Sequence, residues 1–123
     1  MNVTTQETEI LTNINDVLNL LAEGKFIEAM TEYLADDVKL YEGNNDPKVG
    51  KAFCIAEEQK LLSTVVEFGG YKVLSGPAVK GDTSFYEAVM EFKTNDGTEH
   101  RFEQVVRTKW ENGKIVNERF YHV

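Results

Sequence analysis

Several features that would place this chain in a specialised class of protein are scarce or missing. Its single cysteine, Cys54, cannot form an internal disulfide framework, and one thiol is typical of a reducing compartment. No apolar run approaches the roughly 20 residues of a membrane-spanning helix, and the first ten residues lack the basic region and apolar core of a signal peptide. We therefore expect a cytoplasmic protein without membrane association.

Basic residues are also few relative to acidic ones. The 13 Lys and Arg residues face 21 Asp and Glu residues, which gives a net charge of −8. Nucleic acids and anionic membranes select basic surfaces, so neither is expected as a partner. The two histidines, His100 and His122, have no cysteine or carboxylate at ligand spacing. Glycine-rich phosphate loops and serine nucleophile elbows are missing as well. The sequence therefore predicts neither a metal site nor a cofactor.

What the chain does contain is the patterning of one domain, residues 1–123. Its composition, 41% hydrophobic and 28% charged, is that of an ordinary globular protein. Apolar side chains first recur at helical spacing, and from Tyr71 on the period changes to two, which is typical of strands. The expected helices are 5–22, 25–35 and 50–66. This order predicts an α+β fold: three N-terminal helices packed on a strongly curved, mixed but mainly antiparallel sheet that forms a cone with a pocket.

The C-terminal segment 101–123 predicts a hairpin around Asn112-Gly113. A two-residue turn would mix polar and apolar side chains on each face. A three-residue turn with Gly113 as the extra residue gives one coherent inner face, so we predict that turn. The inner face then consists of Phe102, Gln104, Val106, Thr108, Trp110, Val116, Glu118, Phe120 and His122.

A second hairpin is predicted around Asn95-Asp96-Gly97, with Gly97 in the left-handed conformation of a three-residue turn. This register pairs oppositely charged residues across the strands, Glu91 with Arg101 and Lys93 with Glu99. It also places an apolar set beside the inner face of the first hairpin, namely Tyr86, Ala88, Met90 and Phe92. The two hairpins therefore agree on which face is buried.

The inner face is mostly apolar but carries polar groups that a plain core would not contain: Gln104, Thr108, Glu118 and His122. Glu118, expected opposite Val106, should have a raised pKa, which suits a general base. In the alternative register Glu118 lies on the outer face and pairs with Arg107. His122 is either a binding residue or a residue of the rim.

Tyrosines provide further candidates for substrate binding. Tyr33, Tyr41 and Tyr86 would point their hydroxyls into the pocket, although packing with a satisfied hydroxyl is the commoner role of such residues. Trp110 is expected to pack in the core. On the outer face, Val105 and Ile115 lie among charged residues, which is compatible with a sheet-to-sheet contact.

Three segments together resemble the SnoaL-like group of the nuclear transport factor 2-like superfamily. They are Tyr33-Leu34-Ala35-Asp36-Asp37-Val38, then Val49-Gly50-Lys51 opening a helix, then Asn112-Gly113-Lys114-Ile115-Val116 followed by Glu118-Arg119-Phe120-Tyr121. Their order and spacing carry the resemblance, which covers roughly residues 8–122. The resemblance implies a concave pocket for a small hydrophobic or amphipathic ligand, and a homodimer formed through the outer face of the sheet.

Characterised members of this group include polyketide cyclases and ketosteroid isomerases, which move protons at carbon next to a carbonyl. This chain departs from them, because its last strand offers Glu118 rather than an aspartate and no second acid on its inner face. Two functions therefore remain open. One is an isomerase- or cyclase-type enzyme with Glu118 as its catalytic residue; the other is a non-catalytic binding or dimerisation module of the same fold.

Overall fold

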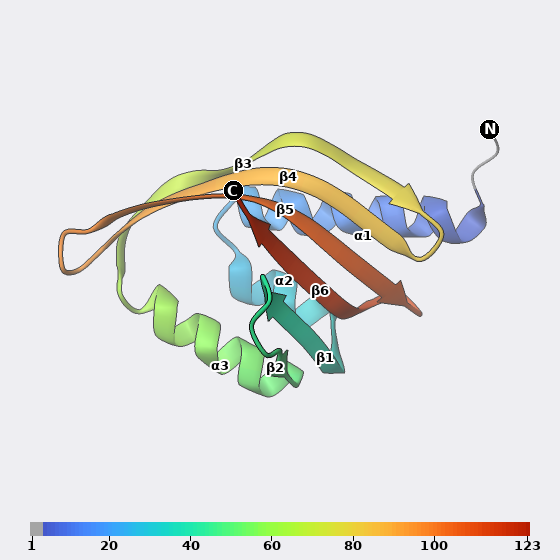
Figure 1. The fold of residues 1–123 in the computed structure, drawn as a ribbon, viewed down its shortest axis with the longest axis horizontal. Coiled ribbons are helices and arrows are strands. Elements are labelled where there is room, and N and C mark those ends of the chain that lie inside the picture. The colour runs from blue at the N-terminus through green and yellow to red at the C-terminus, as the bar shows by residue number, and fades with distance from the viewer. Residues whose placement is uncertain (1–3) are drawn as a thin grey trace.

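The computed structural model describes residues 4–123 and packs three helices against one six-stranded sheet (Figure 1). Residues 1–3 lie outside the described residues. The prediction that the first ten residues are not a signal peptide therefore falls partly outside them. The helices are α1 (Thr5–Ala22), α2 (Phe26–Tyr33) and α3 (Lys51–Leu62). The strands are β1 (Leu34–Glu42), β2 (Lys48–Val49), β3 (Val65–Lys80), β4 (Thr83–Thr94), β5 (Glu99–Glu111) and β6 (Lys114–His122).

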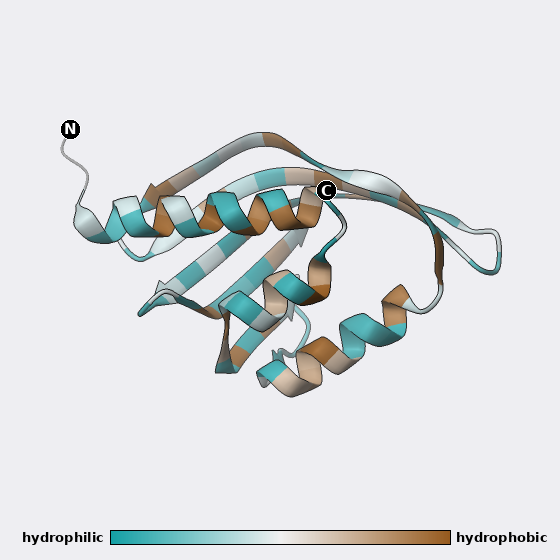
Figure 2. Cartoon of the chain, turned by 180° about the vertical axis from the view of Figure 1, so that it is seen from behind, coloured by the Kyte–Doolittle hydropathy of each residue, from teal (hydrophilic) through white to brown (hydrophobic). Residues whose placement is uncertain are grey.

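The sheet is open and curved, with the strand order β2-β1-β6-β5-β4-β3. Strands β1 and β6 run parallel, while the other neighbours are antiparallel. In Figure 1 the long strands β3, β4 and β5 arch over the helices, and in Figure 2, seen from behind, the helices lie in front of the sheet. The predicted α+β fold with a mixed, mainly antiparallel sheet is confirmed. Within residues 4–123, no helix is long and apolar enough to cross a lipid bilayer.

Local signals set the ends of the helices. Thr4 and Glu7 form a capping box, in which the Thr4 hydroxyl accepts a hydrogen bond from the Glu7 backbone N–H at 3.0 Å. The second helix ends at Tyr33 rather than at residue 35, because β1 already begins at the next residue. The third helix ends at Leu62 rather than at residue 66. The two β-branched residues that follow its last turn, 65 and 66, begin β3 instead.

The predicted three-residue turn between β5 and β6 is wrong. Glu111 pairs with Lys114 across a two-residue turn, whose central residues Asn112 and Gly113 both have positive φ (51° and 75°). Positive φ at both central residues defines a type I′ turn, which matches the right-handed twist of the strands. The Asn-Gly sequence therefore fits the observed turn type. A correction of the strand register by one residue must then occur elsewhere in the hairpin.

That correction is a β-bulge at Val116. Trp110 pairs with Ile115, but Lys109 pairs with Asn117, which leaves Val116 as an extra residue. Ile115, predicted to lie outside, is consequently buried inside the sheet. The bulge restores one coherent inner face, so Thr108, Glu118, Phe120 and His122 all share it, as predicted.

The hairpin of β4 and β5 follows the predicted register. Glu91 pairs with Arg101 and Lys93 with Glu99, and Gly97 has φ +84° in the turn. The two hairpins together build a core in which Trp110 is 1% exposed and donates its indole N–H to the Ser84 hydroxyl at 2.9 Å. The expected core position of Trp110 is therefore confirmed.

Candidate functional site

A cavity of about 420 Å³ lies between the concave face of the sheet and the three helices. Its volume falls within the roughly 300–1,000 Å³ of small-molecule sites. Most of its wall is apolar and comes from α1, α2 and the inner faces of the strands. The polar and charged side chains that line it are Glu42, Lys48, Glu58, Tyr71, Tyr86, Gln104, Glu118 and His122.

Glu118 reaches this cavity from the middle of β6. It pairs with Thr108 rather than with Val106, and the Thr108 hydroxyl donates to its Oε2 at 2.5 Å. Burial raises the pKa of Glu118 to about 7; the bond from Thr108 opposes this rise, and the charge of Glu42 adds to it. The residue keeps some accessible surface, because it faces an open cavity, but protein atoms displace most water from its carboxyl group.

The alternative register, with Glu118 outside, is excluded. Arg107 occupies the outer face, where its guanidinium donates to the Asn117 side-chain oxygen at 2.9 Å. Its partner across the strands is Arg119.

Two tyrosine hydroxyls form a second polar group in the cavity. Tyr71 from β3 and Tyr86 from β4 are buried and lie with their hydroxyl oxygens 3.1 Å apart. Burial raises the pKa of Tyr71 to about 12 and that of Tyr86 well above its ordinary value, and the charge of Glu118 contributes to both shifts. Side-chain hydrogen bonds with Tyr86 and, to a smaller extent, with Gln104 partly oppose the rise in the pKa of Tyr71. Both hydroxyls therefore remain hydrogen-bond donors at neutral pH.

Further acidic groups lie elsewhere on the cavity wall, from elements outside the C-terminal hairpin. Glu42 at the end of β1 contacts His122, whose Nε2 lies 2.6 Å from the Glu42 Oε2. Glu58 comes from α3, and burial raises its pKa while the Lys48 charge lowers it. The expectation that the site lacks a second acid therefore holds for β6 alone, since three carboxyl groups line the cavity.

The predicted site residues fall into three groups: residues that line the cavity, one residue buried behind it, and two tyrosines that lie elsewhere. Glu118, Gln104, Tyr86 and His122 line the cavity together. Thr108 is fully buried behind Glu118 and acts on the cavity only through their hydrogen bond.

Tyr33 and Tyr41 do not line the cavity, and the expectation that their hydroxyls point into it is wrong. The Tyr33 hydroxyl donates to Asp16 at 2.5 Å, and its ring packs edge-on against Trp110 at 5.9 Å. Alternation along β1 turns Tyr41 to the outer face, where the Arg119 guanidinium lies 4.4 Å from its ring centre.

Four polar residues of the cavity were not predicted, Glu42, Lys48, Glu58 and Tyr71, and the sequence contained partial signals for the last two. Glu58 follows Cys54 by four residues and precedes Leu62 by four, so it shares the inward face of α3. Tyr71 pairs with Met90, but the bulges in β3 on either side of it hide the alternation that would have revealed this register. Among residues 4–123, no group of three His, Cys, Asp or Glu side chains is arranged to hold a metal ion.

An open, curved sheet that encloses a cavity with helices on its concave side defines the class: a cone of the nuclear transport factor 2-like type. No protein-family model and no curated protein sequence matches this chain. A proposed SnoaL-like polyketide cyclase from Mesorhizobium loti superposes with a TM-score of 0.78 and 29% identity, over 91% of this chain and 97% of that one. The resemblance predicted from the sequence is confirmed, and the chain has the SnoaL-like fold of this superfamily.

Two more distant structures share the fold. A proposed SnoaL-like polyketide cyclase from Jannaschia sp. CCS1 has a TM-score of 0.78 at 17% identity, over 99% of this chain and 90% of that one. An LEH-like epoxide hydrolase from M. tuberculosis has a TM-score of 0.77 at 16% identity, over 96% of this chain and 85% of that one. At these identities the similarity concerns the fold alone.

Proposed function

We propose that this protein is an isomerase- or cyclase-type enzyme that transfers a proton at carbon in a small hydrophobic or amphipathic carbonyl compound. The observation that carries the proposal is the position of Glu118. Its carboxyl group, with a pKa of about 7, lines the same apolar cavity as the Tyr71–Tyr86 hydroxyl pair. A base of this pKa is partly ionised at neutral pH and strong enough to accept a proton from an activated carbon.

The proposed reaction needs two roles. The Glu118 carboxylate removes a proton from the carbon next to the carbonyl, and the electron pair of the broken C–H bond moves to the carbonyl oxygen as an enolate. Tyr71 and Tyr86 lie in the cavity as donors for that oxygen, because one of their two protons is left over from their mutual bond. In a substrate with a carbon–carbon double bond next to the deprotonated carbon, the enolate extends over that double bond. The Glu118 carboxylic acid then returns its proton to the far carbon of this system as the double bond moves next to the carbonyl, which completes an isomerisation. Thr108 orients the carboxyl group throughout.

The competing function is a non-catalytic binding module with the same cavity. The mostly apolar wall favours it, since such a wall binds hydrophobic ligands without any chemistry. The two functions differ in whether Glu118 exchanges protons with a bound ketone.

Deuterium exchange separates these functions. Small cyclic and aromatic ketones are incubated with the protein in D₂O, and loss of the α-proton signal is followed by NMR. We expect exchange with the parent protein, its loss in Glu118→Gln with ketone binding retained, and a reduced rate in Tyr71→Phe. Glu111→Gln, which changes an exposed carboxylate at the end of β5, is the matched control. A ketone that binds without exchange in the parent protein leaves only the binding module.

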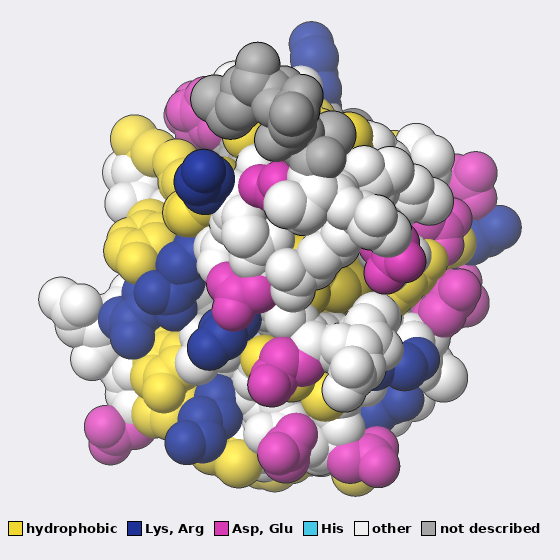
Figure 3. Space-filling view, turned by 90° about the vertical axis from the view of Figure 1, so that its right-hand side faces the viewer, with side chains coloured by type: hydrophobic (Ala, Val, Ile, Leu, Met, Phe, Trp, Pro, Cys, Tyr) yellow, Lys and Arg dark blue, Asp and Glu magenta, His cyan; other side chains and the backbone are white. Residues whose placement is uncertain are grey.

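We also propose that the protein forms a homodimer through the convex face of the sheet. Phe85, Val105 and Tyr121 are large, exposed hydrophobic residues on this face. Figure 3, which has the sheet on its left side, shows hydrophobic side chains among Lys and Arg there. Sedimentation at micromolar concentration should give a dimer that Val105→Lys dissociates, and a monomeric parent protein contradicts the proposal.

The proposed location is the cytoplasm. Cys54 is a buried free thiol, and burial raises its pKa, which keeps it unreactive in a reducing environment. A fluorescent fusion should therefore distribute through the cytoplasm, and accumulation at an envelope fraction contradicts this location.

A further inference from the structure

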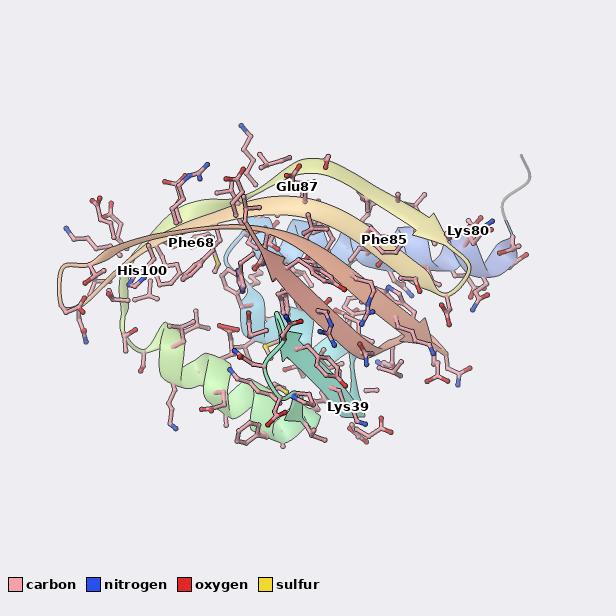
Figure 4. The ribbon with its side chains drawn as sticks, in the orientation of Figure 1. Lys39, Phe68, Lys80, Phe85, Glu87 and His100 are labelled. Atoms are coloured by element: carbon pink, nitrogen blue, oxygen red, sulfur yellow. The ribbon has the colours of Figure 1, made fainter. Side chains whose placement is uncertain are left out.

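A second cavity adjoins the site and has no role in the proposed function. It has a volume of about 270 Å³ and lies between the end of α3, the turn after α1 and the inner face of β3 and β4. Four residues line both cavities, which makes them the wall between the two: Phe26, Glu58, Leu61 and Met90. Phe68, labelled in Figure 4 on the part of the sheet that faces α3, lines the second cavity only.

The wall between the cavities consists of side chains that keep accessible surface. The Phe26 ring packs edge-on against Phe68 of the second cavity (5.6 Å between ring centres) and against Tyr71 of the main cavity (6.2 Å). Met90, which pairs with Tyr71, is unbranched and adapts readily to new neighbours. An elongated molecule that occupies both cavities would pass along these shared residues.

The two cavities offer different polar groups. The main cavity offers a carboxyl group at Glu118 and hydroxyl donors at Tyr71 and Tyr86. Among the described residues that line the second cavity, none is basic, and the acidic ones are Glu23 and Glu58. The two carboxyl groups repel an anionic group, and the other side chains of this lining are apolar, so the second cavity suits an uncharged aliphatic chain.

Two large apolar side chains are exposed where the second cavity meets the surface. Leu61 is 42% exposed and Phe68 is 38% exposed. An aliphatic chain bound in the second cavity would remove part of this apolar surface from water.

We propose that the ligand is an uncharged, elongated amphiphile whose carbonyl head lies at Glu118 and whose aliphatic tail passes Phe26 and Met90 into the second cavity. The position of the head rests on the proposed function. The position of the tail rests on the shared wall and on the lining of the second cavity.

Chain length is the variable that tests this proposal. The dissociation constants of methyl ketones from 2-hexanone to 2-dodecanone are measured by NMR titration of the protein. In the parent protein, affinity should rise by about fourfold for each methylene that enters an apolar site, and should keep rising through the longer members. An affinity that levels off among the shorter ketones, or a protein that binds none of the series, overturns the tail site.

Two variants locate the tail. Leu62 lines the second cavity only, so Leu62→Trp should remove the gain of the longer ketones while the short ones bind as before. Leu40 lines the main cavity only, so Leu40→Trp is the matched control and should weaken short and long ketones alike. An unchanged chain-length dependence in Leu62→Trp overturns the proposal. Thermal unfolding shows whether each variant is folded; if Leu62→Trp is not, Phe68→Ala replaces it and should favour longer ketones.

The same ketones separate this proposal from the proposed function. Binding that rises with chain length but shows no deuterium exchange supports the tail site and removes the enzymatic role. Exchange in ketones whose affinity does not depend on chain length supports the enzyme and overturns the tail site.

Discussion

The concave and convex faces of the sheet both carry glutamates but place them in different surroundings. Thr108 and Glu118 meet inside, whereas Arg107 and Asn117, one residue earlier on each strand, meet outside. The inner carboxyl group has a pKa of about 7, while the outer carboxylate of Glu103 pairs with an exposed arginine at 3.1 Å. Because successive side chains of a strand point to opposite faces, one step along the chain decides whether a glutamate is a candidate base or a surface charge.

The largest expected difference between the faces concerns packing. Trp110→Ala should lower the free energy of unfolding by about 3–5 kcal/mol, because it leaves a cavity in the core and an unpaired Ser84 hydroxyl. Lys109→Ala, one residue away on the exposed outer face, should stay within about 0.5 kcal/mol. Urea denaturation measures both, and equal losses at the two positions would contradict the contrast between the faces.

The next effect depends on pH. The pKa of Glu118 is about 7 in the folded protein and about 4.3 in an unfolded chain, so folding favours its protonated form. This contribution is complete below the unfolded pKa and is lost as the pH rises through 7. Glu118→Gln imitates the protonated form at every pH.

The variant should therefore match the parent protein near pH 4 and exceed its stability by about 1–3 kcal/mol at pH 8. Thermal unfolding across this range checks the prediction. A gap that does not change with pH would mean that the carboxyl group is solvated, like those of the outer face.

A smaller effect is expected from the hydroxyl pair. Tyr86→Phe should cost about 0.5–1.5 kcal/mol, because the Tyr71 hydroxyl loses its buried partner at 3.1 Å. It should also raise the pKa of Tyr71 further, because the hydrogen bond with Tyr86 opposes the rise that burial causes. Urea denaturation gives the first quantity and ultraviolet titration the second; a fully neutral substitution would show that the pair is not a stabilising contact.

The smallest effect lies on the convex face. Glu103→Ala breaks the ion pair with Arg101, but both side chains are partly exposed and occupy one strand. Such pairs contribute about 0.2–1 kcal/mol, so the loss should fall at the low end and shrink further in 1 M salt. A loss comparable to that of Trp110→Ala would indicate that this face is buried in an assembly.

The two hairpins explain how far the sequence could predict the structure. The β4–β5 register was predictable because its turn and its charge pairs, such as Glu91 with Arg101, select the same alignment. In β5–β6 the turn and the burial pattern disagree unless a bulge is allowed, and a bulge leaves no distinct mark in the sequence. The predicted three-residue turn is wrong in its local geometry. It adds one residue, as the bulge does, so the face predicted for Glu118 and the residues after it is correct.

The candidate site was predictable only where it lies on the two C-terminal hairpins, β4–β5 and β5–β6. Glu118, Gln104 and Tyr86 share strands whose alternation is visible in the sequence. Tyr71 and Glu58 reach the cavity from β3 and α3, and their approach depends on the curvature of the sheet and on helix packing. Contacts of that kind are properties of the assembled fold and are not visible in local periodicity.

The bulge at Val116 gives β6 one residue more than its ladder with β5 requires. This extra residue decides whether the even-numbered or the odd-numbered positions that follow it face the cavity. If Val116 occupied an ordinary place in the ladder, the odd positions would face the cavity, and it would be lined by Asn117, Arg119 and Tyr121 in place of the acid. A chain lacking Val116 would need no bulge and would still present Glu118 inward. Whether the Glu118 carboxyl group faces the cavity therefore depends on the position of one unpaired residue in the strand.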